Sequence, residues 1–152
     1  MSEGIRMRWY MKWPLVLVLL AATLFISVLL YQSYVSNPRV TDTLRSDPTG
    51  ERAGIVMLLT FPDGRTIPVN YLREGDTVFA GADGPWWREF RDGGAPVTLL
   101  IRGETLAGHA TVILDDPQYT SEVFRRLRPK APSWLPAWLN GKLVVITLKS
   151  DV

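Results

Sequence analysis

Two tryptophans and two arginines stand close together in the stretch GADGPWWREFRDGGAPVTLLIRGETL, which begins at Gly81. Trp86 and Trp87 are adjacent, and Arg88 and Arg91 follow them. Guanidinium groups bind phosphate through paired hydrogen bonds, and indole rings provide a flat apolar wall. These residue types suit a planar conjugated ring that carries an anionic tail. Packing of the indoles and solvation of the arginines is the plainer alternative, and it stays open.

A second basic position follows the turn at residues 62–64, where Pro-Asp-Gly is typical of a tight turn. Arg65 and Thr66 begin the next apolar run. We expect this turn to face the Trp segment, defined as residues 85–92, so that both border one anion-binding groove. A cofactor held there would carry its own redox chemistry, and no catalytic residue is assigned.

The chain contains no cysteine and a single histidine, His109. This composition excludes thiol nucleophiles, disulfides and Cys/His zinc sites, and we expect no metal site. It also argues against a Ser-His-Asp triad and against haem, because His109 is the sole imidazole.

The net charge of +2 comes from the N-terminus. Residues 1–36 hold three of the 17 basic and one of the 15 acidic residues, so the remaining charges cancel. We therefore expect no nucleic-acid partner.

An uncharged run extends from Trp13 to Pro38. As a helix, residues 13–34 would measure roughly 33 Å, close to the thickness of the hydrocarbon core. Aromatic residues flank the run, as they do at membrane interfaces. A cleaved signal peptide would need small residues at its cleavage site, and Tyr31 and Tyr34 occupy those positions. We predict a single-pass anchor, with a cleaved signal peptide or a buried helix as alternatives.

Basic residues are slightly more frequent before this run than after it. Arg6, Arg8 and Lys12 precede it, whereas Arg39 and Arg45 follow it. This bias predicts a cytoplasmic N-terminus, but a difference of one residue leaves the membrane side of the following domain undecided.

Residues 54–149 are expected to form a mainly β (α+β) domain. Short apolar runs between turn residues predict strands at 54–61, 65–73, 77–82, 96–102, 104–114 and 142–149. A helix is expected to start with Asp116 as its N-cap and Pro117 as its first residue. Because tight turns join most strands, we predict an antiparallel barrel with one or two helices. The chain then consists of an anchor (1–36), a linker (37–53) and a cofactor-binding barrel (54–152).

Three stretches resemble the deazaflavin-dependent nitroreductase family, within the flavin-binding split-barrel superfamily. They are MLLTFPDGRTIPVNYLREGD, PWWREFRDGGAPVTLLIRGETLAGHATVI and GKLVVITLK, in order between residues 54 and 149. The resemblance implies a split β-barrel, a bound deazaflavin (coenzyme F-420) and hydride transfer to a quinone, nitro compound or similar acceptor. By the same resemblance, the phosphate side would be lined by Arg65, Thr66 and Pro68, and the cofactor groove by Trp86, Trp87, Arg88 and Arg91.

The sequence departs from the family's pattern at two places. A longer basic loop, GRKSGKPR in many members, is PDGR here, and an asparagine of the family is Glu89. Fewer cations and an added carboxylate disfavour a polyanion, so flavin mononucleotide or no cofactor remain alternatives.

Two classes of function follow. The first is a membrane-anchored oxidoreductase, whose partners would be the bilayer, through the N-terminal helix, and a lipophilic acceptor. The second is a non-catalytic split-barrel subunit of a membrane assembly, with membrane-protein partners. A flavin mononucleotide binder is a third possibility, and a cofactor titration separates the three.

Overall fold

The computed structural model describes residues 12–31, 37–132, 134, 136 and 141–149. The chain divides into two compact units between Arg39 and Val40, and all six strands belong to the second unit.

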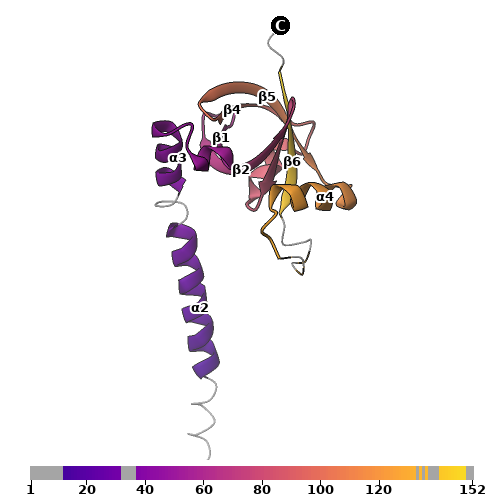
Figure 1. Ribbon diagram of the computed structural model, residues 1–152. Coiled ribbons are helices and arrows are strands. Elements are labelled where there is room, and N and C mark those ends of the chain that lie inside the picture. Colours follow the sequence, from indigo (N-terminus) through magenta and orange to yellow (C-terminus); the bar gives the residue numbers. More distant parts are fainter. Residues whose placement is uncertain (1–11, 32–36, 133, 135, 137–140, 150–152) are drawn as a thin grey trace, which may run out of the picture. The chain divides into compact units, whose positions relative to one another are not determined.

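The helix of the first unit, α2, runs from Lys12 to Tyr31 (Figure 1). Two of its hydroxyl groups form hydrogen bonds within the helix: Thr23 Oγ1 donates to the Leu19 carbonyl and Ser27 Oγ to the Thr23 carbonyl, each at 2.8 Å. None of the helices that the described residues form is long and apolar enough to cross a membrane. The predicted anchor also includes residues 1–11 and 32–36, which lie outside the described residues.

The second unit is a closed barrel of six antiparallel strands. They are β1 (Val56–Thr60), β2 (Thr66–Glu74), β3 (Thr77–Ala82), β4 (Ala95–Ile101), β5 (Glu104–Ile113) and β6 (Lys142–Leu148). Around the barrel the order is β1-β2-β3-β6-β5-β4, and β4 pairs with β1 to close it (Figure 1). The predicted mainly β barrel with helices is confirmed, and each predicted strand end lies within two residues of the observed one.

Tight turns set the register of the hairpins. The β1–β2 turn places Gly64 at φ 86°, a conformation that glycine adopts without strain. At this turn the Phe61 amide donates to the Arg65 carbonyl at 2.9 Å. The β4–β5 turn has positive φ at both central residues, 49° at Arg102 and 81° at Gly103, which is the type I′ pattern of two-residue hairpins.

The core fills the inside of the barrel. Alternate residues of each strand point inward, as the two-residue period of a strand requires. The buried interior residues are Met57, Leu59, Phe61, Val69, Val78, Ala80, Ala82, Phe90, Val97, Leu99, Ile101, Ala110, Val144, Ile146 and Leu148. No polar or charged side chain of the described residues is buried.

Helix α4 (Pro117–Leu127) covers the outer face of β3 and β6. Val123 and Phe124 are buried there against Phe79 and Leu143. The predicted N-cap is confirmed, because the Asp116 side chain accepts a hydrogen bond from the Tyr119 amide at 2.9 Å.

The polar residues before the barrel contain regular secondary structure. Their composition and breakers predict a linker over 37–53, but the structure forms α3 (Asn37–Ser46) and the 3-10 helix η2 (Glu51–Gly54). Leu44 is 4% exposed and packs with Ala53 and Leu58. The few apolar residues of this stretch therefore cover the outer face of β1. From Val40 onward the stretch belongs to the same compact unit as the barrel.

Candidate functional site

The Trp segment closes one end of the barrel. Its first six residues form the 3-10 helix η3 (Pro85–Phe90), with Pro85 at the first turn, where a missing N–H is tolerated. Phe90 is 1% exposed and stacks on Phe61 at 5.7 Å between ring centroids. Trp86 meets both rings edge-on, at 6.2 Å from Phe61 and 6.1 Å from Phe90. We call Phe61, Trp86 and Phe90 the aromatic cap, because they seal the interior at the end of β1.

Arg65 ties the β1–β2 turn to η3. Its guanidinium forms an ion pair with Glu89 and lies 3.7 Å from Asp63, while its central carbon stands 4.3 Å from the centroid of the Phe61 ring. The side chains of Arg65 and Glu89 are 46% and 41% exposed, so the pair stabilises the fold by about 1 kcal/mol at most. The structure thus brings the predicted turn and the Trp segment together, and two carboxylates already neutralise Arg65.

Arg88 and Arg91 both lie over Trp87. Their guanidinium carbons are 5.8 and 5.0 Å from the centroid of its ring, within the range of cation–π attraction. Neither forms an ion pair with any carboxylate of the described residues. Trp87 is half-buried against the core, so this ring holds two unneutralised cations at the surface.

Thr66 and Pro68 lie on the outer face of β2. Their strand neighbours Ile67 and Val69 point inward, so alternation directs these two outward. The Thr66 hydroxyl is 2.9 Å from that of Thr60 on β1. The described contacts link the Trp segment to the turn through Arg65 and Phe61, and they do not include Thr66 or Pro68.

His109 braces the loop that follows η3. Its Nε2 donates to the Gly93 carbonyl at 2.9 Å. Gly94, at φ 83°, packs so closely that a Cβ there would lie 2.3 Å from the Ala110 carbonyl oxygen. The single histidine is thus exposed and bound to a loop.

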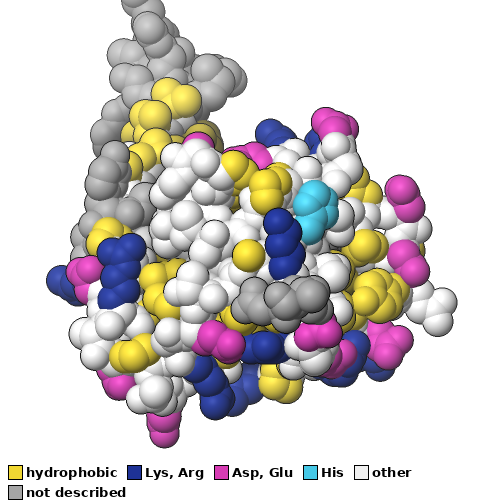
Figure 2. All heavy atoms as spheres, turned by 90° about the horizontal axis from the view of Figure 1, so that it is seen from above, with side chains coloured by type: hydrophobic (Ala, Val, Ile, Leu, Met, Phe, Trp, Pro, Cys, Tyr) yellow, Lys and Arg dark blue, Asp and Glu magenta, His cyan; other side chains and the backbone are white. Residues whose placement is uncertain are grey.

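On the face seen in Figure 2, acidic and basic side chains are interspersed rather than segregated.

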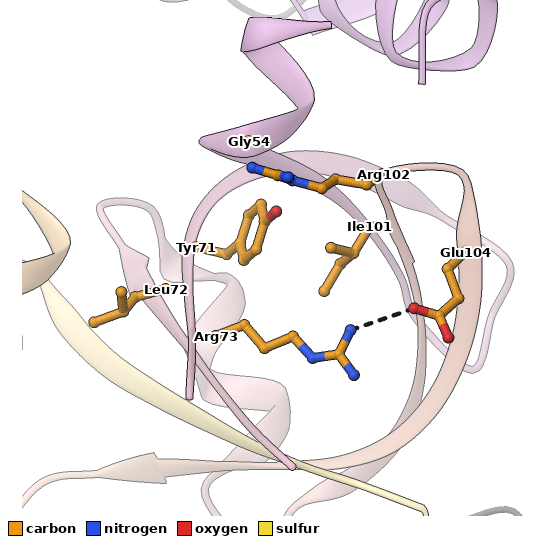
Figure 3. Close-up of a pocket in the computed structure, with 7 residues that line it drawn as sticks. All are labelled: Gly54, Tyr71, Leu72, Arg73, Ile101, Arg102 and Glu104. Carbon is orange, nitrogen blue, oxygen red and sulfur yellow. Dashed lines mark hydrogen bonds and ion pairs between the residues drawn. The ribbon is translucent and has the colours of Figure 1, made fainter. Parts of the chain in front are cut away.

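A pocket of about 350 Å³ lies at the other end of the barrel. The strand register shows the position of the pocket, because β1 begins opposite Asn70 and the pocket residues of β2 and of the β4–β5 hairpin lie near that beginning. The aromatic cap, in contrast, follows the end of β1. The pocket is lined by Gly54, Tyr71, Leu72, Arg73, Ile101, Arg102 and Glu104 (Figure 3).

Charged groups edge this pocket, and an apolar surface lies between them. Arg73 Nη1 is 3.3 Å from Glu104 Oε2, and Arg102 stands at the opposite side, over Gly54 (Figure 3). The Tyr71 hydroxyl donates to the Ala53 carbonyl at 2.9 Å, which fixes the ring. None of these residues was predicted to form a site. The signal that could have identified them is alternation, which places Arg73 on the same inward face as Val69 and Tyr71.

Comparisons with known proteins give similarity to solved structures but match no family. No protein-family model matches the chain, and no curated protein matches it. Among solved structures, it is similar to a Listeria innocua protein described as a "putative pyridoxamine 5'-phosphate oxidase", at 17% identity and a TM-score of 0.49. The likeness covers 73% of this chain and 93% of that chain. At this level of similarity, no conclusion about a ligand follows.

Proposed function

We propose that the barrel binds a phosphorylated flavin-type cofactor beside the Trp segment and acts as an oxidoreductase. The observation that carries the proposal is the pair Arg88 and Arg91. Two guanidinium groups are held over one indole ring, and no carboxylate of the described residues neutralises them. Guanidinium groups form paired hydrogen bonds with phosphate oxygens, so a phosphate is a ligand that these two arginines would bind. The resemblance of the sequence to deazaflavin-dependent proteins makes coenzyme F-420 the first candidate and flavin mononucleotide the second.

The side chains present fit the phosphate of such a cofactor better than its ring. Arg88 and Arg91 have hydrogen-bonding capacity to spare, and contact with Trp87 limits their freedom, so less entropy is lost on binding. Arg65 is engaged by Glu89, and it would bind phosphate only after releasing that carboxylate. Trp86 is committed to the aromatic cap. The cofactor would supply hydride transfer, while these residues would bind and orient it.

The test is a titration of the full chain in mild detergent. Oxidised coenzyme F-420 and flavin mononucleotide are each added to the wild type and to Arg88→Gln, Arg91→Gln and the double variant. Each charge-assisted bond contributes roughly 1.5–3 kcal/mol, so each single change should weaken affinity by about ten-fold to a hundred-fold. Arg125→Gln is the matched control, because Arg125 is an exposed residue of α4 with no ion pair in the described structure.

The outcomes of this titration separate the candidate functions. Affinity that ignores Arg88 and Arg91 would place the phosphate elsewhere. Absence of binding to the wild type would favour a non-catalytic subunit of a membrane assembly. One observation favours that second candidate: Arg65 and Trp86, two of the residues assigned to the cofactor, are already occupied by contacts within the barrel.

We also propose that residues 1–36 hold the protein at a membrane, near a lipophilic acceptor such as a quinone. The uncharged sequence from Trp13 to Pro38 supports this, and the described large apolar side chains of α2 are exposed. Deletion of residues 1–36 keeps α3 complete, and it should move the protein from the membrane pellet to the soluble fraction. Equal fractionation of the two forms would contradict the anchor.

A further inference from the structure

The pocket at the end of the barrel opposite the aromatic cap combines an apolar floor with one unneutralised cation. Ile101 and the ring of Tyr71 face each other across it (Figure 3). Ile101 is 3% exposed and belongs to the core, so the floor is continuous with the apolar interior. A volume of about 350 Å³ is within the range of small-molecule pockets.

Arg73 and Glu104 form the lower edge and compensate each other. Their ion pair spans 3.3 Å, and Arg73 Nε also donates to the Gly75 carbonyl at 3.2 Å. Both residues occupy inward-facing strand positions, which are apolar deeper in the barrel. The pair therefore offers a polar edge with no net charge.

Arg102 provides the remaining charge from an unusual backbone position. It has φ 49° in the type I′ turn, where asparagine, aspartate or glycine is normally preferred. Its guanidinium lies over Gly54, where an added Cβ would come within 3.0 Å of Nη2. This guanidinium group forms no hydrogen bond or ion pair with the residues that the structure describes. The left-handed backbone conformation of Arg102 and the lack of a side chain at Gly54 thus place an unpaired guanidinium group over the pocket.

We propose that this pocket binds a small organic monocarboxylate with an apolar body. The carboxylate would pair with the Arg102 fork, and the apolar body would cover Tyr71 and Ile101. The lining residues carry a single excess positive charge, which a monoanion balances and a dianionic phosphate exceeds. The site is separate from the proposed cofactor site, because the two lie at opposite ends of the barrel.

The experiment uses the full chain in detergent micelles, with empty micelles as the blank. Benzoate is the probe, and benzamide is its neutral counterpart of the same shape. Binding is followed by ligand-detected nuclear magnetic resonance. The main variant is Arg102→Asn, since asparagine tolerates the left-handed turn and removes the cation. Arg102→Lys keeps the charge without the fork, and Arg125→Gln controls for net charge.

Benzoate should bind the wild type and Arg125→Gln equally, and more tightly than benzamide. Arg102→Asn should weaken benzoate binding by about ten-fold or more and leave benzamide unchanged, with an intermediate affinity for Arg102→Lys. The thermal midpoint of Arg102→Asn should equal or exceed that of the wild type, because the turn is relieved of strain. Absence of benzoate binding to the wild type, or equal affinity in Arg102→Asn, would overturn the proposal. Tighter binding of inorganic phosphate than of benzoate would overturn the assigned ligand class.

Discussion

Replacing Trp86 with alanine distinguishes two roles for that residue, a wall for a cofactor ring and a part of the aromatic cap. The structure places Trp86 edge-on to both Phe61 and Phe90, at about 6 Å. If it belongs to the cap, Trp86→Ala must lower the free energy of unfolding in the absence of any ligand. If it is only a ligand wall, stability should be unchanged.

The expected loss of unfolding free energy in Trp86→Ala follows from the burial of the ring and its contacts with two other rings. Truncation of a fully buried tryptophan costs roughly 3–5 kcal/mol, and each aromatic pair contributes about 0.5–1.5 kcal/mol beyond area burial. Trp86 is half-buried but loses two ring contacts, so we expect a loss of roughly 2–4 kcal/mol. Domains are stable by about 5–15 kcal/mol, so Trp86→Ala should still fold.

The assay is urea unfolding of the full chain in detergent, followed by far-ultraviolet circular dichroism. The midpoint should fall while the slope with denaturant stays constant. Trp134→Ala is the control, because Trp134 is 77% exposed and its loss should change stability by less than about 0.5 kcal/mol. The cap assignment is refuted if Trp86→Ala unfolds at the wild-type midpoint while cofactor affinity collapses.

Two further predictions concern residues around the cap. Glu89→Gln should remove one of the two carboxylates beside Arg65 and raise affinity for a phosphorylated cofactor, most strongly at low salt. Stability should change by less than about 1 kcal/mol, because the ion pair is exposed. Titrations at two salt concentrations check this, and an unchanged affinity at both would contradict it. Gly94→Ala should lower the free energy of unfolding by roughly 2–4 kcal/mol, because its Cβ would collide with the Ala110 carbonyl oxygen as well as strain the backbone. Gly64→Ala, where the new Cβ would meet open space, should lower it by roughly 1 kcal/mol, and equal losses in urea unfolding would refute the steric argument.

The strands and α4 were predictable because local signals fix them. The turns at Gly64, Gly75 and Gly103 each need a positive φ, and the sequence supplies glycine there. Asp116 and the proline after it mark the start of α4. Helix α3 was not predicted because only a few apolar residues of a polar stretch form its buried surface. The contact that stabilises the helix, with the outer face of β1, becomes visible only in the folded structure.

The roles of the site residues were less predictable, because they depend on partners that lie far apart in the sequence. The guanidinium of Arg65 is suited to phosphate until the fold brings Glu89, 24 positions away, against it. The indole of Trp86 is suited to a ligand by its residue type, but in the structure Phe61 packs against it. Residue types indicated which groups could bind an anion, whereas packing decided that Arg88 and Arg91 remain available.

The most direct test of the central claim is the affinity of the full chain for oxidised coenzyme F-420 and flavin mononucleotide at low and high salt. The proposal predicts saturable binding of one of them, weakened by salt and by the loss of Arg88 and Arg91. Wild-type protein that binds neither cofactor at low salt would contradict the account.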